Sequence, residues 1–144
     1  MTDPFDLQRF VDAQAEVYSR VVTELRQGRK RSHWMWFIFP QLAGLGHSAM
    51  AQRFAIASAE EGVAYLAHPT LGPRLRECTA LINATEGRAI REILGSPDDL
   101  KFCSSMTLFG AVSGEAEFLQ AIAKYYGGAQ DQRTLDLLAS TRRG

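Results

Sequence analysis

The chain has 144 residues, of which 46% are hydrophobic and 22% charged, and its 16 basic residues balance 16 acidic ones. A chain of this length buries roughly 68–70% of its unfolded surface, so we expect one domain spanning residues 1–144 that needs no disulfide or metal to fold. The composition excludes a collagen-like fibre, a disulfide scaffold and a disordered tail. Because no apolar run approaches the roughly 20 residues that cross a bilayer and no signal peptide is visible, the sequence predicts a cytoplasmic protein without a membrane partner.

Helical spacing of apolar residues dominates the first part of the chain. Residues 6–27 carry one apolar stripe, which predicts a single long helix capped by Asp6 and ended by Gly28. The run WMWFIF at residues 34–39 fits a buried strand as well as a buried helical turn. Since no second convincing strand is present to pair with it, we expect the helical turn.

The rest of the chain continues the helical pattern, with polar caps before each apolar stripe. The expected helices span about 48–57, 58–67, 71–83, 85–94, 96–110, 115–126 and 132–139. The sequence therefore predicts an all-α, single compact domain of about seven to eight short and medium helices.

The segment GLGHSA at residues 44–49 matches the G-x-G-x-x-A fingerprint of dinucleotide-binding folds. That motif requires a strand before it and an acidic residue about 20 positions later, and the pattern shows neither. We therefore do not expect a Rossmann site, although a helix N-terminus that binds some other anion stays open as an alternative.

The cysteines and histidines indicate neither a metal site nor a cofactor. Cys78 and Cys103 are isolated, so we expect two buried thiols. His33, His47 and His68 lack the spacing of metal ligands.

Charge is unevenly distributed even though the net charge is zero. Residues 25–59 contain no Asp or Glu, but they hold five basic residues: Arg26, Arg29, Lys30, Arg31 and Arg53. Such a segment attracts anions, although it is also compatible with a solvated loop that binds nothing. Overall neutrality argues against duplex DNA as a partner.

Two segments supply the candidate ligand-binding residues. In the first, cationic and polar groups precede two tryptophans, and Trp36, Phe37 and Phe39 are expected in the core. In the second, residues 101–109, Lys101, Ser104, Ser105 and Leu108 share one helix face, which either meets solvent or lines a polar pocket. The ligand-binding candidates are Lys30, Ser32, His33, Trp34, Lys101, Ser104, Ser105, Thr107 and Thr134.

Asp131 is the candidate catalytic residue, because it is the carboxylate that closes the proposed pocket. In an enzymatic version it would serve as general acid or base, while Lys30, Lys101 and His33 hold anionic oxygens. The alternative is that Asp131 only caps the helix that follows it. No G-x-S-x-G elbow is present, which argues against Ser104 or Ser105 as a nucleophile.

The chain resembles a bacterial family known as domain of unknown function 1810, some members of which are labelled calpastatin. The matching motifs are RKRSHWMWFIFPQ at 29–41, GLG at 44–46 with Ser48, YL at 65–66, HP at 68–69, LG at 71–72, RL at 74–75, Lys101, SSMTLF at 104–109, Gly128, Asp131 and Thr134. The resemblance implies a helical single domain. The label implies no calpain inhibition, which needs long disordered repeats.

A second similarity is to the helical family that hydrolyses ADP-ribose N-glycosidic bonds. It comprises Lys101-Phe102 and the turn Gly127-Gly128 with Asp131. Clear counterparts of that family's remaining pocket residues are lacking. If the protein is an enzyme, the similarity implies hydrolysis of an ADP-ribose-type bond.

Three functions remain open at this point. In the first, a polar pocket binds or processes a small phosphate-containing ligand, such as a nucleotide or an ADP-ribose derivative, which requires Lys30, Lys101 and Asp131 to converge. In the second, the basic segment 26–53 docks a protein or RNA without catalysis. In the third, the marked residues are merely the core and caps of a helical scaffold.

Overall fold

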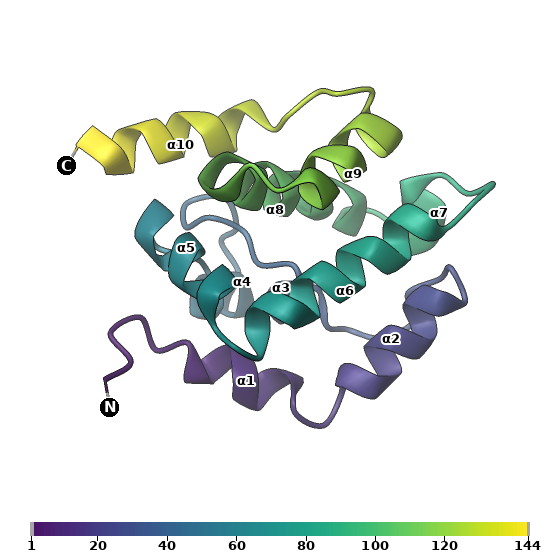
Figure 1. Ribbon diagram of the computed structural model, residues 1–144, viewed down its shortest axis with the longest axis horizontal. Coiled ribbons are helices and arrows are strands. Elements are labelled where there is room, and N and C mark those ends of the chain that lie inside the picture. The colour runs from purple at the N-terminus through teal and green to yellow at the C-terminus, as the bar shows by residue number, and fades with distance from the viewer. Residues whose placement is uncertain (1, 144) are drawn as a thin grey trace.

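The structure is a computed structural model that describes residues 2–143, with side chains described as far as residue 140. Within this range the chain forms ten helices and no strand (Figure 1). Their bounds are α1 Gln8–Gln14, α2 Tyr18–Arg26, α3 Met35–Ile38, α4 Ala49–Arg53, α5 Ala59–Ala67, α6 Leu71–Ala84, α7 Ile90–Leu94, α8 Asp98–Ser113, α9 Ala116–Tyr126 and α10 Gln132–Arg143. The all-α prediction is confirmed, and the expected seven to eight helices become ten.

One extra helix arises because residues 6–27 do not form a single helix. The chain bends after Gln14, whose buried side-chain amide donates to the carbonyl of Phe37 at 2.7 Å. Asp6 was also wrongly predicted as the cap, since it has a φ of +51°. The carboxylate of Asp3 accepts from the backbone N–H groups of Leu7 and Gln8 instead, at 2.8 and 2.9 Å.

The helix boundaries otherwise follow the local signals closely. Ser48 and Ser58 cap α4 and α5 as expected, by accepting from Ala51 N–H and Glu61 N–H. At α7 the prediction was wrong, because Ala89 rather than Thr85 holds the N-cap position and Glu92 accepts from its N–H.

Helix α8 forms the centre of the domain and packs against α5, α7, α9 and α10 (Figure 1). All residues from Ser104 to Gly110 are buried, so α8 is enclosed by its neighbours rather than half exposed. Aromatic rings extend from it in two directions, with Phe102 against Phe39 at 4.9 Å and Phe109 against Phe118 at 5.9 Å between centroids. The helices thus share a single hydrophobic core.

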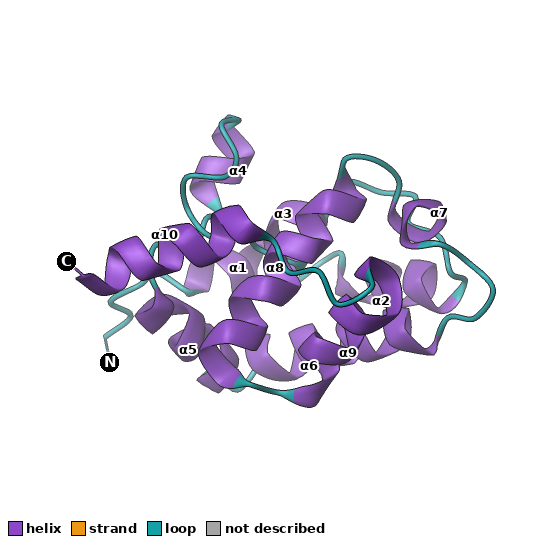
Figure 2. Ribbon diagram, turned by 90° about the horizontal axis from the view of Figure 1, so that it is seen from above, coloured by secondary structure: helices purple, strands orange, loops and turns teal. Residues whose placement is uncertain are grey.

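The segment between α3 and α5 leaves the core and returns to it. The backbone at Ile56 pairs with residues 41 and 43: Ala43 N–H donates to the Ile56 carbonyl at 2.8 Å, and Ile56 N–H donates to the Gln41 carbonyl at 2.9 Å. Between these bonds lies α4, which contributes no buried residue and projects from the body of the molecule (Figure 2). This helix is shorter than the expected 48–57 because residues 55–57 make the return.

Gly72 provides a stability test in the first turn of α6. A Cβ at this position would stand 2.1 Å from the carbonyl oxygen of Leu66. We expect Gly72→Ala to lower the free energy of unfolding by about 2–3 kcal/mol, because backbone has to move to relieve the contact. The measurement is urea unfolding followed by circular dichroism.

Gly62→Ala in α5 is the matched control. Its new Cβ would meet Val112 at 3.5 Å, an ordinary contact. Helix propensity should then raise the stability by up to about 1 kcal/mol. Equal effects of the two substitutions would contradict the packing assigned to Gly72.

Candidate functional site

The basic segment before α3 is fixed by a buried carboxylate, that of Glu24 in α2. Its Oε1 accepts from the backbone N–H groups of Arg31 and Ser32 and from the indole N–H of Trp34, at 2.7, 3.0 and 2.9 Å. Its Oε2 accepts from the Ser32 hydroxyl. Glu24 is 5% exposed, so an acidic residue next to the acid-free segment determines how that segment is held.

These bonds determine where two of the candidate ligand-binding residues lie. Ser32 is bound to Glu24, and Trp34 is 1% exposed, with its ring packed 6.2 Å from that of Phe39. His33, between them, is exposed. The side chains of Ser32 and Trp34 therefore contribute to the support of the segment.

Lys30 and Lys101 converge on one acidic residue, Asp98. The Lys30 Nζ lies 2.9 Å from Asp98 Oδ2, and the Lys101 Nζ lies 3.8 Å from Asp98 Oδ1. Each ammonium also lies over a tryptophan ring, Lys30 over Trp34 at 5.2 Å and Lys101 over Trp36 at 5.8 Å from the centroid. The two lysines therefore lie close together, but they face different cavities.

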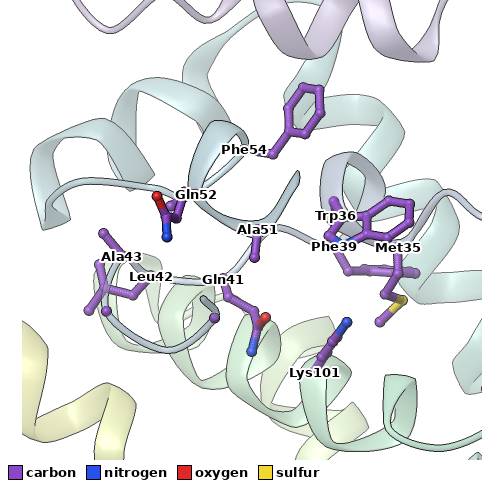
Figure 3. Close-up of a pocket in the computed structure, with 13 residues that line it drawn as sticks. Met35, Trp36, Phe39, Gln41, Leu42, Ala43, Ala51, Gln52, Phe54 and Lys101 are labelled. Atoms are coloured by element: carbon purple, nitrogen blue, oxygen red, sulfur yellow. The ribbon is translucent and has the colours of Figure 1, made fainter. Parts of the chain in front are cut away.

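Lys101 faces a cavity of about 120 Å³ between α3, α8 and the segment that carries α4. Its side chain extends toward Met35 and Trp36, with the Gln41 amide beside it (Figure 3). Trp36 was expected in the core, but it is only half-buried and forms part of this cavity wall. The complete lining is Met35, Trp36, Phe39, Gln41, Leu42, Ala43, Gly44, Gly46, Ala51, Gln52, Phe54, Ala55 and Lys101. We call it the aromatic cavity.

A second cavity of about 280 Å³ adjoins the first and contains three charged side chains, those of Lys101, Asp131 and Arg133, in an otherwise mostly apolar lining. It shares Gln41, Gly46 and Lys101 with the aromatic cavity. Its complete lining is Gln41, Leu45, Gly46, Pro97, Leu100, Lys101, Ser104, Asp131 and Arg133. We call it the polar cavity. Lys101 thus stands at the junction of an aromatic space and a polar one.

Asp131 lies at the N-cap of α10 and at the wall of the polar cavity. Its Oδ2 accepts from the Ser104 hydroxyl at 3.0 Å, from Thr134 N–H at 3.3 Å and from the Thr134 hydroxyl. Its backbone N–H donates to the Thr107 hydroxyl at 2.9 Å. Among the described residues, Oδ1 accepts no hydrogen bond. The expected capping role is therefore present, and one carboxylate oxygen remains for a ligand.

The polar face predicted on α8 is divided between these environments. Lys101 and Ser104 line the polar cavity, and Thr107 holds the turn before α10. Ser105 is fully buried, and its hydroxyl oxygen has no hydrogen-bond partner within the described chain. Apart from Lys101, whose side chain is 30% exposed, the face is buried.

The thiols and the glycine motif do not suggest chemistry. Burial raises the pKa of the Cys78 thiol to about 12, which suppresses its thiolate. Cys103, expected to be buried, is only half-buried; partial burial and then the charge of Asp131 raise its pKa as well. The motif at 44–49 leads into α4, which has five residues and whose N-terminus Ser48 already caps.

The described residues hold no group of three or more His, Cys, Asp or Glu side chains suited to a metal ion. None of the helices between residues 2 and 143 combines the length and apolarity that crossing a membrane requires.

Comparison with known proteins identifies the class of this helical domain. The model of the family described as "Protein of unknown function (DUF1810)" matches residues 4–138, and the chain belongs to this family. The resemblance found in the sequence is thereby confirmed.

The chain is also similar to a protein of known structure, the conserved hypothetical protein Rv1873 from Mycobacterium tuberculosis. The two share 62% identity with a TM-score of 0.94, over 95% of this chain and 99% of that one. No curated protein matches the chain. These relationships establish family and fold, and the chemistry has to be argued from the site.

Sequence reasoning missed several residues that shape this site. Glu24 and Asp98 were seen only as part of helical patterns, and Gln41 only as part of the family motif. Asp98 and Lys101 stand at positions i and i+3 in the first turn of α8, and this spacing was an available signal for their pairing. The pairing of Lys30 with the same carboxylate joins residues far apart in the chain and left no local signal.

Glu24 gives a pH-dependent prediction. Burial opposes ionisation, but the bonds from Ser32, Arg31 and Trp34 prevail and hold the pKa of Glu24 below its usual value. A lowered folded-state pKa stabilises the protein above the unfolded value of about 4.3, and this contribution is lost as pH falls through the folded value. We therefore expect Glu24→Gln to be less stable than wild type at pH 7, with the difference vanishing toward pH 2.5 in urea unfolding.

Glu24→Ala is the companion variant, because it removes the acceptor altogether. It should cost about 3 kcal/mol or more at pH 7, since several buried donors lose their partner at about 1–3 kcal/mol each. A wild-type advantage over Glu24→Gln that persists undiminished at pH 2.5 would show that the charge is not what stabilises the loop.

Proposed function

We propose that the protein binds a small phosphate-containing ligand of nucleotide or ADP-ribose type in the joined aromatic and polar cavities. The observation that carries this proposal is the position of Lys101, which belongs to both linings. One side of its ammonium faces the ring of Trp36, and the other faces the cavity that contains Arg133.

The two cavities match the two halves of such a ligand. A flat heteroaromatic ring fits against Trp36 and Phe39, with the Gln41 amide available to hydrogen bond its edge (Figure 3). Phosphate oxygens fit near Lys101 and Arg133, since ammonium and guanidinium groups form short, charge-assisted bonds with phosphate. Leu45 and Leu100 supply apolar contact for a sugar at the rim.

An enzymatic version of this function uses Asp131. Its Oδ2 is held by Ser104 and Thr134, which orients Oδ1 in the wall of the polar cavity. A carboxylate oriented in this way is suited to activate a water or to stabilise positive charge that develops on a sugar. Hydrolysis of an ADP-ribose-type N-glycosidic bond is the reaction that fits this arrangement together with the sequence similarity at Lys101-Phe102.

Binding is tested by thermal shift with NAD, ADP-ribose, nucleotides and sugar phosphates. A ligand at 100 times its Kd stabilises the folded state by about 2.7 kcal/mol, which corresponds to roughly 5–10 °C for a domain of this size. We expect Lys101→Gln to abolish the shift that the wild type shows. Lys30→Gln is the matched control, because Lys30 also pairs with Asp98 but lines neither cavity, and it should retain the shift.

The absence of a shift across the panel would contradict the proposal and favour the basic segment as a docking module. A shift that survives in Lys101→Gln would place the ligand elsewhere on the molecule.

Asp131 allows capping to be separated from catalysis. Asparagine caps helices about as well as aspartate, whereas alanine loses about 1 kcal/mol. We expect Asp131→Asn to keep the wild-type melting temperature and ligand affinity but to lose hydrolysis of ADP-ribosyl compounds, measured by product chromatography. Wild-type activity in Asp131→Asn would exclude an acid or base role for this carboxylate.

A further inference from the structure

A third cavity, of about 440 Å³, lies between the turn that follows α2 and helix α7. Its lining is Arg29, Lys30, Arg88, Arg91, Glu92, Leu94 and Gly95. Gly95 belongs to this cavity and Pro97 to the polar cavity, so the turn before α8 separates the two. We call it the arginine cavity.

The two walls of the arginine cavity are tied together. The N–H of Lys30 donates to the carbonyl of Ile93 at 2.7 Å, which links the turn to α7. Gly28 has a φ of +73°, and a Cβ there would lie 3.4 Å from the side chain of Arg88. The Arg88 side chain therefore packs against the bare backbone of Gly28, next to the cavity.

The lining of the arginine cavity carries four basic residues and one carboxylate, that of Glu92. Lys30 is paired with Asp98 and its side chain is only 9% exposed. The Glu92 carboxylate is engaged at the N-terminus of α7, where it accepts from Ala89 N–H at 2.9 Å. Within the described residues, Arg29, Arg88 and Arg91 form no ion pair, and all three are exposed.

We propose that the arginine cavity binds a pyrophosphate-type anion, separately from the ligand proposed for the joined cavities. A guanidinium group presents a planar fork of donors that matches two phosphate oxygens, so three arginines suit an anion with several phosphoryl oxygens. A free diphosphate and the backbone of single-stranded RNA both present phosphoryl oxygens to guanidinium groups, although only the diphosphate links two phosphoryl groups directly.

The test is calorimetric titration of the full chain with inorganic pyrophosphate. We expect Arg88→Gln and Arg91→Gln each to weaken binding about tenfold, and the double variant to abolish it. Arg91→Lys should recover only part of the affinity, because lysine keeps the charge but not the fork. Arg20→Gln is the matched control, an exposed arginine of α2 that does not line this cavity.

Three results would overturn the proposal. They are a failure of pyrophosphate to bind at 50 mM salt, binding to the Arg88/Arg91 double variant as tight as to wild type, and an equal loss of binding in Arg20→Gln. The last result would show a diffuse electrostatic attraction rather than a site. Circular dichroism confirms that each variant is folded before titration.

Two further arms separate this site from its alternatives. If a single-stranded RNA of 12 nucleotides binds the wild type, is displaced by pyrophosphate and does not bind the double variant, the phosphoryl source is nucleic acid. RNA that binds without such displacement would overturn the site as drawn. Lys101→Gln should leave pyrophosphate affinity unchanged, and the Arg88/Arg91 double variant should retain the thermal shift that nucleotides and ADP-ribose give. A nucleotide shift that is lost in the Arg88/Arg91 double variant but retained in Lys101→Gln would overturn the joined-cavity proposal alone, so the two proposals can fail independently.

Discussion

The geometry of this protein's cationic surface depends on one buried carboxylate. Glu24 carries its charge into the interior, and the cost of removing that charge from water is offset by donors from Arg31, Ser32 and Trp34. Because these donors come from neighbouring residues, they fix the backbone conformation of the segment that follows α2. Lys30 is then directed toward Asp98, and the same acidic residue meets Lys101 on α8. A series of contacts thus links the buried Glu24 carboxylate to the cavities that Lys30 and Lys101 line.

Much of the fold could be predicted because its signals are local. Apolar spacing, serine caps and glycine stops each depend on a few neighbouring residues, and Ser48, Ser58 and Gly28 are placed as their patterns indicate. The break between α1 and α2 could not be predicted, because it depends on the carbonyl of Phe37, which comes from another part of the chain. Local pattern reports where a helix is allowed, whereas long-range hydrogen bonds decide where it bends.

The candidate site shows the same division. Lys101, Ser104, Asp131 and Thr134 could be singled out because hydroxyl and charged groups stand out on an apolar helix and after a glycine turn. The structure brings these four together around Asp131 and the polar cavity. Trp36 was expected in the core, and Gln41 appeared only within the family motif. Neither could be assigned to a cavity, because the sequence of a four-residue helix does not show which of its sides faces one. Arg88 and Arg91 drew no attention, because their importance depends on the approach of a turn some 60 residues earlier.

The backbone contact between residues 41–43 and 56 has a consequence for how this fold can diversify. The excursion that carries α4 leaves and re-enters the body at adjacent points, contributes no buried side chain between residues 44 and 53, and nevertheless supplies one wall of the aromatic cavity. Its length and composition can therefore change while the core remains as it is. In engineering terms the excursion is an exchangeable cassette, and grafting different sequences between residues 44 and 54 offers a way to redesign what the cavity admits on a constant scaffold.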